Sequence, residues 1–310
     1  MEFDGRWERD GRNPLAAALL LVIGAGTFYF LAQSLLLNGY IMFDELLRKD
    51  VVSSPDLGTA MRETYRRYRV PILTVLALTQ FLLLFLVTIT RVRVWHTRKA
   101  FAYLGFTKFP VGGILLGVAG VLTLLPAVEY LGHLIYSLVP NLRNFGDSTS
   151  PLVTATTPGE YALILFAIAV TPAICEETLF RGYFQRTLQR RMSAPWHYLL
   201  SGTLFALFHQ RVLSLPSLIL VGVYLGFLFS RYNSIYTTMA SHFAYNGTLI
   251  VLANSALRTS RFVNADGFTL TTVEISLALF AVVTGVIVAT TRGSVPSAGD
   301  SAGASTVAPG

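Results

Sequence analysis

The sequence contains little cysteine and few charged residues. One cysteine, Cys175, occurs in 310 residues, which excludes an intrachain disulfide and any site built from several thiolates. Asp, Glu, Lys and Arg make up 13% of the chain, against about 25% in an ordinary globular protein. So little charge argues against a coiled coil. A chain this rich in apolar residues also does not have the composition of a disordered protein.

Hydrophobic residues are abundant instead. They form 53% of the chain, and the mean hydropathy is +0.56. A soluble enzyme could not cover this much apolar surface. The apolar runs are continuous rather than alternating, which favours helices over a membrane β-barrel. We therefore expect an all-α, multi-pass transmembrane helical bundle.

A helix that crosses a bilayer needs ~20 mostly apolar residues, and about eight runs are candidates. The first run is longer than a usual signal-peptide core, so we expect it to remain as an uncleaved span. The expected spans are 15–37, 70–90, 111–139, 161–191, 196–213, 215–229, 235–257 and 273–290.

Basic residues exceed acidic residues by 24 to 17. Most of the basic residues lie in short segments between apolar runs, where they act as orientation signals and contacts for acidic lipid. This placement gives no reason to expect nucleic acid as a partner. It predicts a cell-membrane protein with a cytoplasmic N-terminus, although segment 48–69 places six basic residues on the outside. The sequence does not define an oligomeric state.

Strongly polar groups inside hydrocarbon cost at least ~2.5–3.5 kcal/mol each on insertion scales, so their presence requires a reason. Three of the expected spans carry such groups in their apolar runs. They are Glu176, Glu177 and Arg181 in the fourth span, His209 in the fifth, and His242 and Asn246 in the seventh.

The spacing of these groups predicts how they face. Glu177 and Arg181 are four residues apart, the favourable order for an ion pair within a helix. Glu176 is rotated by ~100° from Glu177, so it faces elsewhere. Phe205 and His209 share one helix face, as do His242 and Asn246. Glu176 and His209 each lie ~20 Å from the connection between their spans, so antiparallel packing places them level.

This combination of side chains suits hydrolysis. A carboxylate beside a histidine can orient and deprotonate water. A histidine and an asparagine amide can donate hydrogen bonds to a developing oxyanion. Glu176, His209 and His242 are also a set that a metal such as zinc accepts. The H-E-x-x-H pattern is absent, so the sequence leaves the metal unknown.

The ordered motifs E-E-x-x-x-R (Glu176 to Arg181), F-x-x-x-H (Phe205 to His209) and H-x-x-x-N (His242 to Asn246) resemble the CAAX-protease and bacteriocin-processing family, also called the Abi family. This family includes the type II CAAX prenyl endopeptidases. The resemblance covers roughly residues 161–257.

The resemblance implies an intramembrane endopeptidase that acts on a protein or peptide substrate. Glu176 and His209 would activate water, His242 and Asn246 would form the oxyanion site, and Glu177, Arg181 and Phe205 would support them. Both a metalloprotease and a metal-free glutamate mechanism are argued for the family. Neither the substrate nor its prenylation can be carried over.

The sequence accordingly divides into six segments. We expect a polar segment at 1–13, transmembrane helices at 14–140 with a polar loop at 41–69, and a loop at 141–159. A catalytic helical core at 160–257 follows, then a last transmembrane helix within 258–292 and a disordered tail at 293–310.

Other readings of the same residues remain open. A transporter could use the intramembrane Glu and His residues to relay protons, and a non-catalytic scaffold could use them to bind a membrane partner. Cys175 has no positive surroundings in the sequence and is expected to be a small buried hydrophobe. Glu129 and His133 are expected near a membrane interface.

Overall fold

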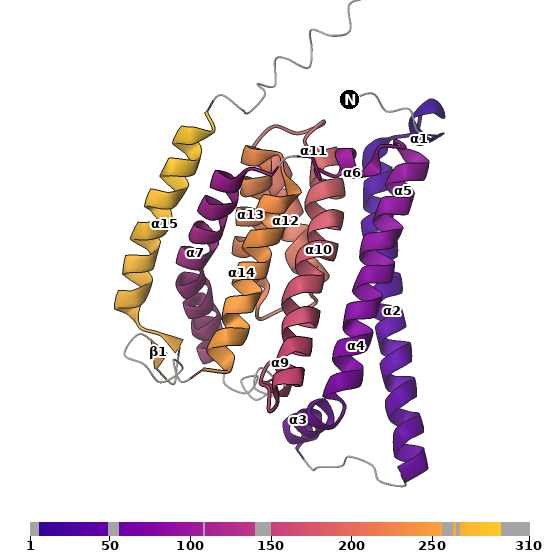
Figure 1. Ribbon diagram of the computed structural model, residues 1–310, viewed down its shortest axis with the longest axis vertical. Helices are drawn as coiled ribbons and strands as arrows, with labels where there is room; N and C mark the ends of the chain where they lie inside the picture. The colour runs from indigo at the N-terminus through magenta and orange to yellow at the C-terminus, as the bar shows by residue number, and fades with distance from the viewer. Residues whose placement is uncertain are drawn as a thin grey trace, which may run out of the picture.

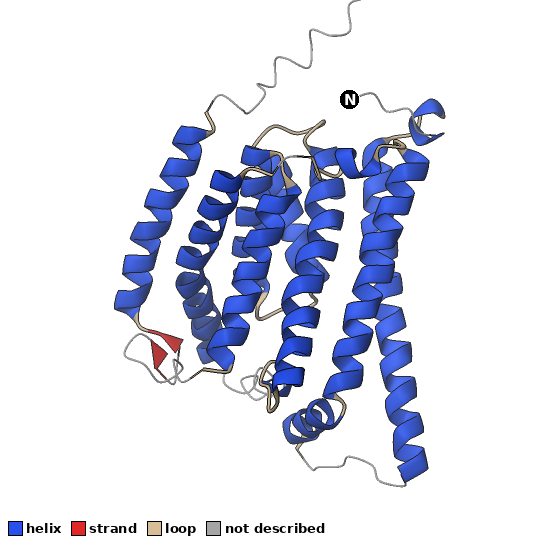
Figure 2. Cartoon of the chain, viewed as in Figure 1, coloured by secondary structure: helices blue, strands red, loops and turns tan. Residues whose placement is uncertain are grey.

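The computed structural model describes residues 6–48, 56–107, 109–139, 150–255, 263–264 and 267–292. Nearly all of this chain is helical (Figure 2). The strands in the described part are two residues long each, β1 (Val263–Asn264) and β2 (Gly267–Phe268), and they pair antiparallel. The multi-pass helical bundle predicted from composition is confirmed.

Long helices dominate the element order, and two of them are interrupted by π-helical turns. The single helices are α2 (Pro14–Arg48), α7 (Val111–Leu138), α12 (Trp196–Phe208), α13 (Leu215–Tyr232), α14 (Ile235–Ala253) and α15 (Leu270–Thr290). One composite rod joins α4 (Arg69–Thr79), the π-helix η1 (Gln80–Leu86) and α5 (Val87–Trp95). A second joins α9 (Pro158–Leu165), η4 (Phe166–Val170), α10 (Thr171–Glu177), η5 (Thr178–Gln185) and α11 (Arg186–Leu188). The short elements are α1 (Arg6–Arg9), α3 (Leu57–Arg67), α6 (Ala100–Tyr103) and the 3-10 turn η3 (Ser150–Leu152).

Six of these helices, counting each composite rod as one, are long and apolar enough to cross a membrane. The two other expected spans are helical but do not meet that standard. Helix α12 has 13 residues and ends at Phe208, short of the expected end near residue 213. Helix α14 has 19 residues, but its polar side chains keep it outside the six. The spans that carry the histidine motifs are thus the two least suited to contact lipid on their own.

The bundle places the helices that carry the three sequence motifs between two flanking layers (Figure 1). Helix α2 and the α4–α5 rod stand together at one edge, and α15 stands at the other edge against α7. The α9–α11 rod, α12, α13 and α14 lie between them. Helix α1 lies at the same end of the bundle as α5, α6 and α11.

The segment expected to be a polar loop at 41–69 is largely helical where it is described. Helix α2 continues to Arg48, whose guanidinium binds Asp44 one turn earlier at 2.8 Å. Helix α3 begins after Asp56, whose carboxylate caps it by accepting the Thr59 amide hydrogen at 2.8 Å. Local charge pairing and capping explain these helices, since they satisfy groups that an unstructured loop would leave to water.

The basic residues of this segment are partly neutralised. Arg48 pairs with Asp44, and Arg66 pairs with Glu63 at 3.0 Å. Arg69 is buried and binds Glu160 at 2.6 Å, which joins the start of α4 to the start of α9. The expected tail at 293–310 and residues 141–149 of the expected loop at 141–159 lie outside the described residues.

Helices α12 and α13 form an antiparallel hairpin whose backbones touch at two glycines. A Cβ atom added to Gly202 would lie 2.5 Å from the backbone nitrogen of Val223, and one added to Gly222 would lie 2.7 Å from the carbonyl oxygen of Gly202. Backbone atoms cannot move aside as a side chain can. The absence of side chains at these two positions therefore sets the spacing of the hairpin.

We expect Gly202→Ala to push α12 away from α13 and to lower the thermal unfolding temperature of the detergent-purified protein, because overpacking costs ~1–3 kcal/mol. Gly24→Ala is the matched control. Apart from the adjacent residues and the backbone of its own helix, no atom lies within 4 Å of a Cβ placed there. Alanine there should leave the unfolding temperature unchanged or raise it slightly. Equal effects of both variants would contradict the proposed contact.

Candidate active site

The two acidic residues of the first motif lie where α10 meets the π-helix η5. Glu176 and Glu177 end α10, and Arg181 lies inside η5. A second π-helix, η4, precedes α10. π-helical turns are rare and often mark functional sites. The rod from α9 to α11, called the rod below, is therefore irregular on both sides of the carboxylates.

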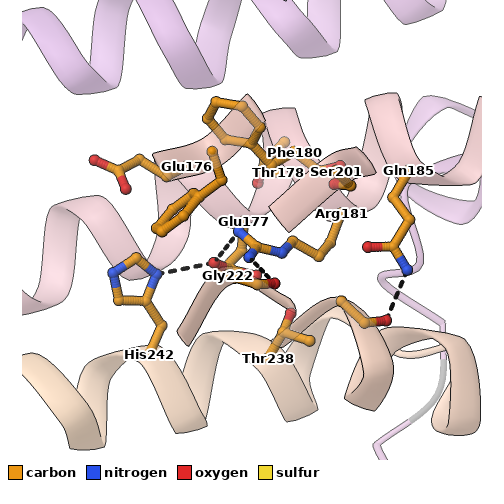
Figure 3. Close-up of polar contacts among 12 residues, drawn as sticks. Glu176, Glu177, Thr178, Phe180, Arg181, Gln185, Ser201, Gly222, Thr238 and His242 are labelled. Carbon is orange, nitrogen blue, oxygen red and sulfur yellow. Dashed lines mark hydrogen bonds and ion pairs between the residues drawn. The ribbon is translucent and has the colours of Figure 1, made fainter. Parts of the chain in front are cut away.

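Glu177 and Arg181 form the buried centre of the site. Both side chains have no exposed surface, and Arg181 Nη1 donates to Glu177 Oε1 at 2.9 Å. Arg181 Nη2 also donates to the backbone carbonyl of Gly222 in α13, at 2.8 Å. Figure 3 shows these contacts, together with His242 of α14 on the same Glu177 carboxylate. The ion pair predicted from the four-residue spacing is confirmed.

Phe205 packs against three other side chains of the motifs. The Arg181 guanidinium lies 4.4 Å from the centre of its ring, in a cation–π contact. The rings of His209 and His242 lie 4.7 Å and 5.8 Å away, both edge-on. Phe205 thus contacts both histidine rings. The predicted packing of Phe205 on His209 is confirmed.

Glu176 faces away from the ion pair, as its rotation on the helix predicts (Figure 3). It is 5% exposed, and its Oε2 atom lies 3.8 Å from His209 Nε2. The other ring nitrogen of His209, Nδ1, lies 2.8 Å from the carbonyl oxygen of Phe205. A carbonyl only accepts, so Nδ1 carries the hydrogen, and Nε2 of the neutral ring is an acceptor. Two acceptors therefore face one another at a distance that suits a water donating to both.

His242 and Asn246 lie on α14 but are held differently. His242 Nδ1 lies 2.9 Å from Glu177 Oε1, so Nδ1 donates and the carboxylate fixes the ring. The Asn246 amide donates to the carbonyl oxygen of Ile168 in η4 at 2.8 Å. An amide has two N–H groups, so a second one remains for another partner. The structure thus joins the motif residues in direct contacts except Asn246, which is tied to the rod beside them.

The turn after His209 lies within the depth of the bundle and not at its end. Gln210, which has a positive φ of 54°, Arg211 and Val212 are exposed. Two residues into α13, Ser217 donates to the carbonyl of Val128, which lies ten residues, or ~15 Å, before the end of α7 at Leu138. Exposed non-helical backbone at this depth requires water or protein around it. His209 therefore lies beside exposed, non-helical backbone.

The candidate metal ligands do not gather into a ligand set. Among the described residues, no group of three or more His, Cys, Asp and Glu side chains is arranged to hold a metal ion. His242 Nδ1 is bound to Glu177, the other acid of the motif. Glu176 and His209 alone supply fewer protein ligands than a catalytic zinc site ordinarily has.

Besides the Glu177–His242 bond, two further polar contacts near the site were not expected from the sequence. One is the Gly222 carbonyl, a backbone group that no side-chain pattern could reveal. The other is Glu129 of α7, expected near a membrane interface with His133. Its carboxylate accepts from the Tyr245 hydroxyl of α14 at 2.9 Å, one residue before Asn246. The Glu129–Tyr245 bond holds α14 against α7.

Comparison with protein families supports the resemblance. Residues 158–248 match the family model described as type II CAAX prenyl endopeptidase Rce1-like. This segment contains all of the predicted site residues, and the match implies a peptidase of the CAAX type in a membrane. Neither a curated protein nor a solved structure matches the chain.

We expect Arg181→Met to destabilise the protein strongly, by ~3–5 kcal/mol, because removing one partner of a buried pair leaves the other charge uncompensated. Arg48→Met removes an exposed guanidinium from a similar i,i+4 pair and should have little effect. Thermal unfolding in detergent compares the two variants. An Arg181→Met protein as stable as Arg48→Met would contradict the assigned role of the pair.

Proposed function

We propose that this protein is an intramembrane endopeptidase that hydrolyses a peptide bond with a water activated by Glu176 and His209. The observation that supports this most directly is the pair of acceptors, Glu176 Oε2 and His209 Nε2, facing one another at 3.8 Å. A water that donates a hydrogen to each keeps its lone pairs free for attack. The match to a CAAX endopeptidase model over the same residues supports the reaction class.

The proposed reaction proceeds by addition and elimination. The water oxygen attacks the carbonyl carbon of the scissile bond while the Glu176–His209 pair accepts one of its two protons. That proton then moves to the nitrogen of the leaving amine as the carbon–nitrogen bond breaks. General acid–base catalysis of this kind contributes ~10²–10⁴-fold in rate.

Asn246 and His242 are the proposed donors to the carbonyl oxygen as its negative charge develops. Asn246 has one amide N–H beyond the bond to Ile168. His242 donates through Nε2 when its ring is protonated, since Nδ1 is committed to Glu177. The Glu177 carboxylate then compensates the ring charge. The fully buried Glu177–Arg181 ion pair thus supports the donors through the bond between Glu177 and His242.

We also propose a cytoplasmic N-terminus. Arg190, two residues after the end of α11, contacts Tyr103 of α6, and Trp7 of α1 contacts Trp95 of α5. The basic segments at 6–12, 91–99 and 186–191 therefore meet at one end of the bundle. Clustered basic residues favour the cytoplasmic side. At the other end, Arg48, Arg66 and Arg69 each bind an acidic side chain, but the rule counts Lys and Arg alone, so segment 48–69 remains the exception to this orientation. Surrounding lipid and a peptide substrate are the partners this proposal requires.

We expect Glu176→Gln and His209→Ala each to reduce peptide cleavage by at least ~10²-fold, because each removes a group that accepts the proton of water. Glu129→Gln is the matched control, since Glu129 is a partly buried intramembrane carboxylate whose bond to Tyr245 lies outside the acid–base pair. The assay is cleavage of a quenched fluorescent peptide by purified protein. Full activity in both site variants would contradict the proposal.

We expect activity to persist after dialysis against a strong chelator, because Glu176 and His209 activate the water directly in this proposal. Cleavage before and after chelation, together with elemental analysis of the same sample, provides the measurement. Loss of activity that returns with stoichiometric zinc would instead favour the metalloprotease alternative.

A further inference from the structure

The end of the bundle that carries α1, α5 and α11 holds positive charge without matching acids. Segment 91–99 contains four Lys and Arg residues and segment 186–191 contains three, and neither contains Asp or Glu. Arg12 lies 3.6 Å from Asp10, but both side chains are more than half exposed, so this pair is weak. Arg91 makes no ion pair with another described residue. The charge at this end is therefore available to a partner outside the chain.

Two tryptophans meet at the same end, beside the termini of two apolar helices. Trp7 of α1 and Trp95 of α5 have ring centroids 5.0 Å apart. The apolar helix α2 begins at Pro14, and the apolar α4–α5 rod ends at Trp95. Trp7 Nε1 donates to the Asn13 carbonyl at 2.9 Å, which fixes its ring just before α2. Because tryptophans concentrate at the level of the lipid headgroups, this pair marks a membrane interface.

Each ring of the pair carries an arginine. The Arg12 guanidinium lies 5.2 Å from the centre of the Trp7 ring, and the Arg91 guanidinium lies 5.1 Å from the centre of the Trp95 ring. Both arginines are exposed. A cation–π contact needs no hydrogen-bond acceptor, so the N–H donors of both guanidiniums remain available. Such donors suit phosphate, to which a guanidinium can donate two parallel hydrogen bonds.

We propose that these four side chains, the Trp–Arg cluster (Trp7, Arg12, Arg91 and Trp95), bind the headgroups of acidic phospholipids, with both guanidiniums donating to lipid phosphate. A lipid is the partner because the ring pair lies at headgroup level, where lipid phosphates are concentrated. Acidic lipid is favoured over phosphatidylcholine, whose choline cation would meet the surrounding basic residues. This inference does not depend on the proposed peptidase activity.

The test variant combines Arg12→Gln and Arg91→Gln in protein reconstituted into phosphatidylcholine vesicles that contain brominated phosphatidylglycerol. Bromine on a lipid quenches tryptophan fluorescence on contact, and the chain has three tryptophans. Trp196→Phe is made in every sample, so that Trp7 and Trp95 alone report on the cluster. In protein with both arginines, we expect brominated phosphatidylglycerol to quench more strongly than the same amount of brominated phosphatidylcholine.

The matched control combines Arg93→Gln and Arg98→Gln. It removes the same charge from exposed residues near this end that make no ion pair or ring contact with another described residue. The measured quantity is the binding constant of phosphatidylglycerol relative to phosphatidylcholine. We expect this constant to be at least ~10-fold lower in the test variant than in the control, the factor for losing hydrogen bonds to a charged group.

Equal relative binding constants in the two double variants would overturn the inference, because diffuse surface charge would then explain the preference. Equal quenching by both brominated lipids in protein with both arginines would overturn it as well. Inorganic phosphate should leave the quenching unchanged, and recovery of fluorescence would assign the cluster to free phosphate instead of lipid. If the test variant unfolds at a lower temperature than the control in phosphatidylcholine, Arg91→Gln against Arg93→Gln decides, since both residues lie on α5.

Discussion

The arrangement of the site depends on the complete burial of the Arg181 charge. An isolated guanidinium in a low-dielectric interior is expensive, and it is tolerated only with a paired charge and satisfied donors. Arg181 has a paired charge and three partners from three helices, whereas its buried Nε has no hydrogen-bond partner among the described residues. The three partners are Glu177 on its own rod, the Gly222 carbonyl on α13 and the Phe205 ring on α12. Because Glu177 also binds His242, the pair extends to α14 as well.

This constraint explains why the hairpin of α12 and α13 must be so close. Arg181 reaches a backbone carbonyl of α13, and the same glycine makes contact with Gly202 across the hairpin. A bulkier residue at either glycine would move the carbonyl away from the guanidinium. The hairpin also ends in the turn that presents His209. The buried ion pair, the glycine contact and the position of the proposed acid–base pair are therefore linked.

Sequence reasoning anticipated the contacts that follow from helix geometry. The Glu177–Arg181 pair, the opposite facing of Glu176 and the packing of Phe205 on His209 all follow from 3.6 residues per turn. It did not anticipate that Glu177 would bind His242. These two residues are 65 positions apart in the sequence, and their contact depends on how α10 and α14 pack. It also missed the π-helical turns beside α10 and the early end of α12, since no local residue pattern specifies either. Helix α3 was missed because the charged residues around it resemble a loop.

The N-terminal helices carry no motif of the family, yet the packing makes them part of the site's surroundings. Glu177 is enclosed by the rod, α12, α13 and α14, which all lie within the matched segment. Glu176 points away from that enclosure (Figure 3), on a rod that packs against α2 and the π-helix η1. The rod therefore divides the two acids between two environments. One acid is fixed by an ion pair in the core of the matched segment, and the other lies against a layer that the family motifs do not describe. A motif comparison alone would assign both acids to one environment, although their neighbours differ in kind.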